Sequence, residues 1–363
     1  MDIESIFNQF NHKSAFQDAE PIDSGHINTT YLVRTEDSAL PDYILQKINS
    51  EVFKNIPDLI QNKILVTDFL RAKASDQEKE NIIRLIPTKT GENYYIDSNK
   101  DYWNLMVFIP DSEVYLMAKS TKIAAEAGRL FGQFFYLLND FEAKKLSETI
   151  PRFHDMEHRL DQFENSLKQA NNERLALAQD SIEFVKKNKE KTLLLQELKN
   201  MGKLPLRVTH NDTKISNALF NTKGKGFAVI DLDTLMPGLV HYDFGDSVRT
   251  ICSSAEEDEA DLENVYFIPE KFKAFAGGFL NACKSILKEE EIAHLVLGVE
   301  YMVFIIGLRF LTDYLNNDIY FKTKYPAHNL VRARNQFALL KSMKLHGQEM
   351  QEIISELTQT DQY

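Results

Sequence analysis

Short runs of alternating apolar residues dominate the first third of the chain. Two runs rich in β-branched and aromatic residues, 31–35 and 43–48, flank a polar, turn-forming segment, and this pattern predicts an antiparallel hairpin. Apolar residues at helical spacing over 51–73 predict a helix. Strand-like runs return at 81–86, 93–96 and 102–109. We therefore expect a small antiparallel sheet with one helix laid on it.

The pattern becomes helical after residue 120. Helical spacing of apolar residues, or a charged and helix-favouring composition, extends over 120–141, 156–201, 289–321 and 330–357. Between these blocks, residues 206–229 form two short apolar runs around a polar loop. We place a domain boundary between Pro110 and Ser120, which gives an N-terminal domain of residues 1–115 and a C-terminal domain of residues 116–363.

Charge narrows the classes of partner. The 363 residues carry a formal net charge of −12, and no local basic patch stands out. An acidic surface repels phosphate backbones and anionic lipid. We therefore expect a small-molecule substrate and neither a nucleic-acid nor a membrane partner.

Cysteine content and hydropathy indicate a cytoplasmic protein. The two cysteines are too few for a disulfide framework or a zinc cluster, and no export signal is visible at the N-terminus. The most apolar segment, 292–311, is interrupted by His294, Glu300 and Arg309. These charges favour a buried core helix over a membrane span.

The loop within 206–229 carries residue types that suit phosphoryl transfer. His210, Asp212 and Asn217 stand in the form H-x-D-x-x-x-x-N, and an apolar strand that ends at Asp231 follows. Phosphoryl transfer needs a carboxylate to orient and deprotonate the attacking hydroxyl, and Mg²⁺ held by hard oxygen ligands. Asp212 is the candidate catalytic base. Asn217 and Asp231 are the candidate metal ligands, and Asp233 is a candidate second-metal or supporting ligand.

Three neighbours of this pattern have expected supporting roles. His210 would buttress the loop backbone, and Lys214 would neutralise the transferring phosphoryl group or bind substrate. Asp243-Phe-Gly has the spelling of the protein-kinase magnesium motif, but no apolar strand immediately precedes it and it lies too far beyond Asn217. We interpret Asp243 as a structural acid that caps or braces the loop.

The chain resembles the aminoglycoside phosphotransferase and choline kinase family of small-molecule kinases, and within it the N-acetylhexosamine 1-kinases. The resemblance rests on residues 210–217, 229–238, 243–249 and 308–321, with 25–31 and 44–49 in the N-terminal part. It implies an α+β, bilobal, protein-kinase-like fold. The smaller antiparallel β lobe would bind nucleotide, and the larger, mainly helical lobe would hold the catalytic and substrate sites.

The resemblance also implies ATP and Mg²⁺ as cofactors and assigns nucleotide contacts to the N-terminal lobe. Gly25, Asn28 and Thr29 would belong to a phosphate-binding loop between the first two strands. Backbone amides of such a loop bind phosphate oxygens. A hinge strand would pair with adenine through Met106, Val107 and Phe108.

One lysine is the candidate ligand of the α- and β-phosphates. By resemblance this is Lys47 on the second strand of the hairpin, but a one-residue slip in register would place Gln46 there and turn Lys47 to the other face. Its acidic partner on the following helix is open among Glu51, Asp58 and Asp68.

The acceptor contacts implied by the resemblance come from both ends of the C-terminal domain. They are Asp212, Lys214, Arg309 and Tyr320. A buried guanidinium needs a partner. For Arg309 this is either the substrate or an internal acid, Glu300 or Asp313.

The expected function is ATP- and Mg²⁺-dependent transfer of a phosphoryl group to the anomeric 1-hydroxyl of an N-acetylhexosamine. The alternative acceptors are an aminoglycoside, choline, ethanolamine or another sugar. A non-catalytic nucleotide-binding protein is a remote alternative, because Asp212, Asn217 and Asp231 are all present. A hydrolase is disfavoured, because the sequence has no nucleophile constellation and no metal-binding histidine pair.

Overall fold

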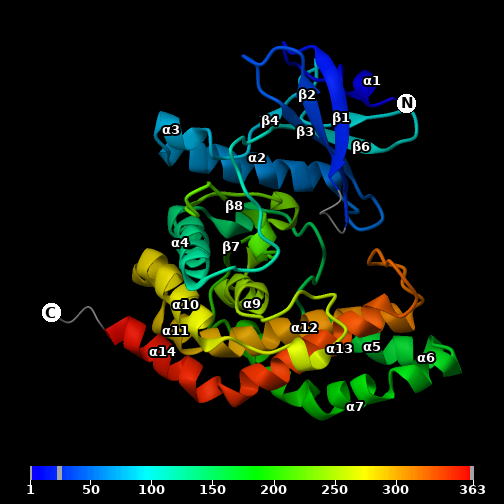
Figure 1. The fold of residues 1–363 in the computed structure, drawn as a ribbon, viewed down its shortest axis with the longest axis vertical. Helices are drawn as coiled ribbons and strands as arrows, with labels where there is room; N and C mark the ends of the chain where they lie inside the picture. The colour runs from blue at the N-terminus through cyan, green and yellow to red at the C-terminus, as the bar shows by residue number, and fades with distance from the viewer. Residues whose placement is uncertain (1, 23–26, 360–363) are drawn as a thin grey trace. The chain divides into compact units, whose positions relative to one another are not determined.

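The computed structural model describes residues 2–22 and 27–359 and divides into two compact units. The first unit extends to Ser112 and also includes the segments Lys145–Pro151 and Leu232–Leu235. The second unit comprises Glu113–Lys144, Arg152–Asp231 and the chain from Met236 onward. The first holds an antiparallel sheet and the second is mainly helical (Figure 1). The predicted α+β class, with a β-rich N-terminal part and a helical C-terminal part, is confirmed.

The sheet of the first unit is antiparallel throughout. Its strands are β1 (Phe16–Ile22), β2 (Thr29–Thr35), β3 (Tyr43–Ile48), β4 (Leu85–Ile86), β5 (Tyr95–Ile96) and β6 (Tyr102–Val107). The strand order is β1-β2-β3-β6-β4, and β5 also pairs with β6. The predicted hairpin is therefore β2–β3, but the run predicted over 81–86 is a strand only at its end. Residues before it form turns, in which the amides of Asn81 and Ile82 bond to the carbonyls of Glu78 and Lys79.

The helices of this unit are α1 (Ile3–Phe7), α2 (Ile56–Lys73) and α3 (Asp76–Lys79). Helix α2 begins later than the pattern predicts, because the Asn55 side chain accepts the amide of Asp58 and caps the helix there. It runs along the sheet in Figure 1, and its buried side includes Leu59, Val66 and Leu70. The short turn η4 (Leu232–Thr234) packs against α2.

The second unit contains short strands and many helices. The strands are β7 (Arg207–Thr209), β8 (Ala218–Phe220), β9 (Gly226–Val229) and β10 (Met236–Gly238). The α-helices are α4 (Thr121–Leu137), α5 (Met156–Gln169), α6 (Asn172–Leu177), α7 (Gln179–Asn188), α8 (Leu194–Asn200), α9 (Val240–Ile251), α10 (Pro269–Cys283), α11 (Glu289–Ala293), α12 (Leu295–Leu315), α13 (His328–Leu345) and α14 (Gly347–Gln359). Short 3-10 turns are η1 (Ala143–Lys145), η2 (Lys189–Thr192), η3 (Ile215–Asn217), η5 (Leu262–Asn264) and η6 (Lys284–Ile286).

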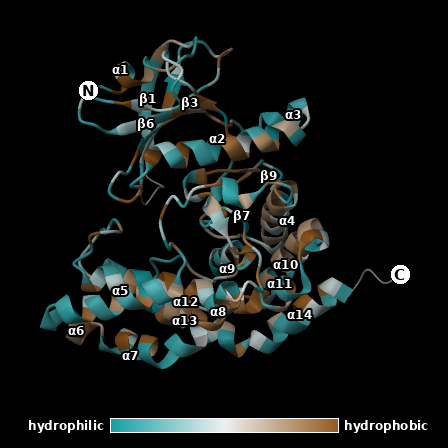
Figure 2. Ribbon diagram, turned by 180° about the vertical axis from the view of Figure 1, so that it is seen from behind, coloured by the Kyte–Doolittle hydropathy of each residue, from teal (hydrophilic) through white to brown (hydrophobic). Residues whose placement is uncertain are grey.

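Helix α12 is the centre of the second unit. It packs against α13, α9 and α5, and Figure 2 shows it mostly in the colours of hydrophobic residues, whereas α5 is largely hydrophilic. Among the described residues α12 alone is long and apolar enough to cross a membrane, judged by length and composition, and 78% of its most apolar window is buried inside the structure. Such burial is typical of a core helix.

The helix-favouring stretch 156–201 is helical, as predicted. It consists of several short helices, because caps interrupt it; Asn171 accepts the amide of Arg174 and starts α6. Helices α9 and α10 have no counterpart among the predicted elements. Almost every residue of α9 is buried, so the helix lacks the contrast between a polar and an apolar face on which periodicity depends.

Candidate active site

The loop that follows β7 is held in place by one buried carboxylate. Asp243, in the first turn of α9, accepts hydrogen bonds from the backbone amides of His210 and Asn211, both at 2.7 Å. Its own carbonyl accepts the Thr213 hydroxyl at 2.6 Å. Burial raises the pKa of Asp243 to about 7, against the two amide bonds, which favour the ionised form. The Asp243 carboxylate is thus hydrogen-bonded to the backbone of the loop.

Two residues at this loop have left-handed backbone conformations. Asn211 has a φ of 63° and Asp231 has a φ of 60°. Non-glycine residues in this region are uncommon, and they concentrate at functional sites where the surrounding structure imposes them. For Asn211 the imposing contacts are the Asp243 carboxylate and a bond between its carbonyl and the His154 ring at 3.2 Å.

The loop presents a carboxylate between an amide and a lysine. The Asn217 side-chain amide donates to the Asp212 carbonyl at 2.7 Å and to its carboxylate at 3.0 Å. Lys214 Nζ lies 3.2 Å from the same carboxylate, and the side chain of Asp212 remains 30% exposed. Burial raises the pKa of Asp212, but the charge and hydrogen bond of Lys214, together with the other positive groups nearby, outweigh it, so the net pKa lies below the ordinary value. Asp212 is therefore a partly accessible carboxylate, ionised at neutral pH.

The β8–β9 hairpin brings the second acid to this loop. Ala218 pairs with Val229, and the Ile230 amide donates to the Asn217 carbonyl at 2.9 Å. His210 Nε2 donates to the Ile230 carbonyl at 2.8 Å, which fixes the proton on that nitrogen because a carbonyl only accepts. The hairpin thus sets Asp231, the next residue, beside Asn217. Burial lowers the pKa of Lys214, but the carboxylates of Asp212 and Asp231 outweigh it and raise the net pKa.

The donor set suits an open magnesium site with few protein ligands. Asn217 uses its amide nitrogen within the loop, so its amide oxygen is the atom suited to a cation. Within residues 2–22 and 27–359, no three His, Cys, Asp or Glu side chains gather into a metal-binding group. Mg²⁺ usually keeps several waters and takes only one or two carboxylates together with substrate phosphates. Asn217 and Asp231 match this kind of open site.

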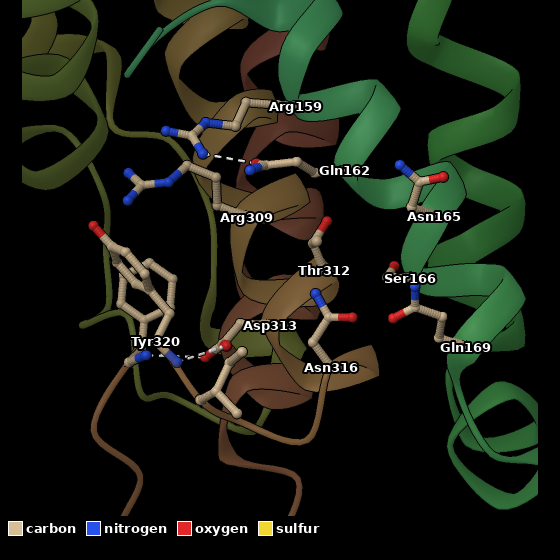
Figure 3. Close-up of a pocket in the computed structure, with 12 residues that line it drawn as sticks. Arg159, Gln162, Asn165, Ser166, Gln169, Arg309, Thr312, Asp313, Asn316 and Tyr320 are labelled. Carbon is tan, nitrogen blue, oxygen red and sulfur yellow. Dashed lines mark hydrogen bonds between the residues drawn. The ribbon is translucent and has the colours of Figure 1, made fainter. Parts of the chain in front are cut away.

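A pocket of about 340 Å³ lies between α5, α12 and the chain after α12 (Figure 3). Its lining is Arg159, Gln162, Asn165, Ser166, Gln169, Arg309, Thr312, Asp313, Asn316, Ile319, Tyr320 and Phe321. Arg309 and Tyr320, the two residues expected at an acceptor site, therefore line the same cavity. The Tyr320 hydroxyl is enclosed and has no hydrogen-bond partner among the described residues.

Aromatic rings, and not an acid, surround Arg309. Its guanidinium lies 4.6 Å from the centre of the Phe153 ring, 5.4 Å from Tyr320 and 5.3 Å from Phe321. Asp313, one of the two expected partners, instead accepts the amides of Tyr320 and Phe321 at 2.8 and 2.9 Å. Over the part of the chain that the structure describes, no ion pair involves Arg309. Its charge is held by the faces of the rings.

Arg159 is a second cation in this pocket that the sequence did not single out. It donates to the Phe153 carbonyl at 2.8 and 3.0 Å and to the Gln162 side chain at 2.7 Å. Burial, and then repulsion from Arg309, lower the pKa of Arg159 to about 9, so the Arg159 guanidinium is charged at neutral pH. The sequence gave no sign that Arg159 lines a pocket, because a charged residue is ordinary in an amphipathic helix such as α5.

Comparison with known proteins identifies the family. Residues 18–275 match the model of the phosphotransferase enzyme family named APH. The chain belongs to this family. The phosphotransferase is thus an enzyme that transfers phosphoryl groups, as the loop predicts.

Solved structures share the fold of this phosphotransferase at low identity. A microcompartment-associated aminopropanol kinase has a TM-score of 0.62 at 15% identity, over 96% of this chain and 97% of the other. An aminoglycoside phosphotransferase from Alicyclobacillus acidocaldarius has a TM-score of 0.57 at 11% identity, over 99% and 96%. A spectinomycin phosphotransferase in complex with ADP and spectinomycin has a TM-score of 0.54 at 12% identity, over 95% and 94%. The protein-kinase-like fold is confirmed.

The first unit of the phosphotransferase places Lys47 and Gln46 on opposite faces of β3. Lys47 Nζ lies 2.9 Å from the carboxylate of Asp101, and its side chain is 37% exposed. Asp101 precedes β6, so the acid partner lies outside the following helix, where Glu51, Asp58 and Asp68 were considered. Gln46 is buried, and its side-chain oxygen accepts from Asn104 at 3.2 Å and lies 3.4 Å from Lys63 Nζ.

The remaining candidate nucleotide contacts also belong to this unit. Gly25 lies outside the described residues. The Asn28 side chain donates to the Asp233 carboxylate and accepts the Asn49 amide at 2.9 Å, and Thr29 opens β2 opposite Lys47.

On the candidate hinge strand, Met106 pairs with both Ile44 and Leu85. The amides of Val107 and Phe108 donate to the carbonyls of Arg84 and Asp42, at 3.0 and 2.9 Å. Adenine contacts by these residues stay a prediction, and the two amides already donate hydrogen bonds within the unit.

Proposed function

We propose that this phosphotransferase is an ATP- and Mg²⁺-dependent kinase of a neutral, hydroxyl-rich small molecule. The leading acceptor is the anomeric 1-hydroxyl of N-acetylglucosamine or N-acetylgalactosamine, and the product is the sugar 1-phosphate. Family membership supports phosphoryl transfer. ADP in the similar spectinomycin phosphotransferase supports a nucleotide donor.

The observation that carries the acceptor proposal is the polarity of the pocket. Arg159 and Arg309 both line it, and the carboxylate of Asp313 is occupied by backbone amides. The other polar groups are neutral amides and hydroxyls, from Gln162, Asn165, Gln169, Asn316, Ser166, Thr312 and Tyr320. A cationic acceptor such as an aminoglycoside or choline would meet two positive charges there. Neutral hydroxyl and acetamido groups instead match amide and hydroxyl partners.

The loop residues have roles that follow from their chemistry. Asp212 would orient the acceptor hydroxyl and take its proton, and Lys214 would hold this carboxylate ionised and neutralise developing charge. Asn217 and Asp231 would hold Mg²⁺, whose charge offsets that of the phosphates during transfer. An anomeric hydroxyl is more acidic than an ordinary alcohol. The enzyme's main contributions would therefore be positioning and charge neutralisation.

A cationic acceptor remains the second candidate because of one observation, the net charge of −12. An acidic surface attracts cations by long-range steering. Steering acts on the rate of encounter, however, while the pocket residues contact the bound molecule. We therefore rank the local charge of the pocket above the net charge of the chain.

A coupled ADP-release assay with ATP and Mg²⁺ tests this function. The acceptor panel contains N-acetylglucosamine, N-acetylgalactosamine, galactose, choline, ethanolamine, kanamycin and aminopropanol. We expect turnover of an N-acetylhexosamine, and ³¹P NMR of the product should show a phosphate on the anomeric carbon. Turnover of a cationic acceptor alone would overturn the acceptor proposal. Failure to bind Mg·ADP would overturn nucleotide-dependent transfer altogether.

A further inference from the structure

A lysine lies on the buried side of helix α2. Lys63 is only 2% exposed and is flanked along the helix by the buried residues Leu59 and Val66. A buried ammonium group is costly unless it is paired. Lys63 pairs with the carboxylate of Asp233, which is also 2% exposed. Both members of the pair are therefore buried charges.

The same pair contacts two further parts of the first unit, the candidate phosphate loop and strand β3. Asn28, from the candidate phosphate loop, donates to the Asp233 carboxylate. Gln46 of β3 lies 3.4 Å from the ammonium. Lys63 thus provides the positive charge on the face of β3 that Gln46 occupies, while Lys47 lies on the opposite face with Asp101.

Asn62, the residue before Lys63, binds the segment Leu232–Leu235 at its other end. Asn62 is 2% exposed, and its side-chain amide donates to the carbonyls of Leu235 and Ser147, both at 2.8 Å. Its oxygen accepts the Ser147 amide at 3.0 Å. Adjacent residues of α2 therefore fix both ends of the segment Leu232–Leu235, which begins directly after the candidate metal ligand Asp231.

Stability alone does not account for such a pair. Replacing a buried ion pair with well-packed apolar residues is often neutral or stabilising, and Lys63 lies in an apolar helix side that could hold a leucine. The pair is better explained by what it fixes. One of its members touches a candidate phosphate-loop residue, and the same member lies two positions after Asp231 in the chain.

We propose that Lys63, acting through Asp233, is a positioning residue for binding of the magnesium–nucleotide complex. In this proposal, which rests on the proposed function, Asp233 is the partner of Lys63 and not a metal ligand. The pair sets the position of Asn28 and of the chain that leaves Asp231. Losing it should weaken nucleotide binding chiefly in the presence of Mg²⁺.

Calorimetric titration of ADP, with Mg²⁺ and with EDTA, tests the pair. The full-length variants are Lys63→Met, Asp233→Asn and the double variant, with Lys73→Met at the exposed end of the same helix as the matched control. The measured quantity is the ratio of the dissociation constant in EDTA to that in Mg²⁺. We expect the three pair variants to lose at least tenfold in this ratio, while Lys73→Met stays within twofold of the wild type.

The double variant separates positioning from folding. If Lys63→Met leaves Asp233 unpaired and fails to fold, removing both charges should restore folding, which circular dichroism reports. The double variant should still lack the Mg²⁺-dependent part of the affinity. Wild-type ratios in the folded double variant would overturn the inference and leave the proposed function intact. A wild-type protein that binds no Mg·ADP would overturn the proposed function, and the inference with it.

Discussion

The loop that carries Asp212 and the cluster around Lys63 are organised in different ways. In the loop, Asp212, Lys214 and Asn217 lie within a few residues of each other and contact each other directly. In the cluster, Lys63 and Asp233 come from distant parts of the chain and meet only in the folded unit. Short motifs therefore describe the first region well. The second becomes visible only when the register of β3 and the rotation of α2 are known.

The largest effect expected from the loop side of this comparison is that of Asp212→Asn. Loss of the base should lower kcat by about 10³-fold, while Mg·ADP binding stays near that of the wild type. The coupled ADP-release assay and calorimetry measure the two quantities, and Asp161→Asn on the exposed side of α5 is the matched control. Retained turnover would remove Asp212 from its role as base.

Lys214→Met tests whether the ammonium group of Lys214 keeps the neighbouring Asp212 ionised. Removing this charge should lower kcat by about 10²-fold, as for other preorganised charge-stabilising groups. The burial of Asp212 would then raise its pKa without the opposing ammonium. A base with a raised pKa becomes protonated at higher pH, so the acid limb of the kcat/KM profile should move to higher pH. An unmoved limb would show that Lys214 does not set the ionisation of Asp212.

Asp243→Asn tests the brace beneath the loop. An amide has a single oxygen acceptor for the two backbone amides, so the variant should lose about 1 to 2 kcal/mol of unfolding free energy in mildly acidic buffer. The pKa of Asp243 in the folded protein, about 7, exceeds the ordinary carboxyl value. Its stabilising contribution is therefore complete at low pH and is lost as the pH rises through about 7. Urea unfolding at several pH values should show the gap between wild type and variant narrowing with rising pH, and a constant gap would contradict the raised pKa.

The smallest effect is expected from Lys47→Met, a variant that compares Lys47 with Lys63. Half-exposed ion pairs contribute about 1 kcal/mol or less, so Mg·ADP affinity should fall by about fivefold at most. Calorimetry under the conditions used for Lys63→Met makes the comparison direct. A loss as large as that of Lys63→Met would restore Lys47 as the phosphate-binding lysine that the resemblance implies.

The fold class could be predicted from the sequence because its main signals are local. The β2–β3 hairpin, the helix α2 and the apolar helix α12 each have a clear period or a long apolar run. Helix α9 could not be predicted, because burial on all sides removes the contrast between faces. Helix boundaries within 156–201 were missed because caps such as Asn171 act over a single turn.

The arrangement of the candidate site could be predicted only where its residues are neighbours in the chain. The register of β3 decides between Gln46 and Lys47, and a slip of one residue reverses the faces. Lys63 did carry a signal, since it interrupts the apolar side of α2 between Leu59 and Val66. Nothing in the sequence, however, indicates that Asp233 is its partner. Arg309 was expected to contact either the substrate or an internal acid, and the structure places aromatic rings around it.

The first unit is built from segments that lie far apart in the sequence, and this has a consequence for folding during synthesis. This unit includes Leu232–Leu235, a segment that the ribosome adds long after Ser112. Until that segment emerges, Lys63 and Asn62 lack the partners they have in the finished structure. A fragment that stops at Ser112 would therefore bury an uncompensated charge. The first unit can reach its final form only when about two thirds of the chain has been synthesised, so it is completed only after the loop that ends at Asp231.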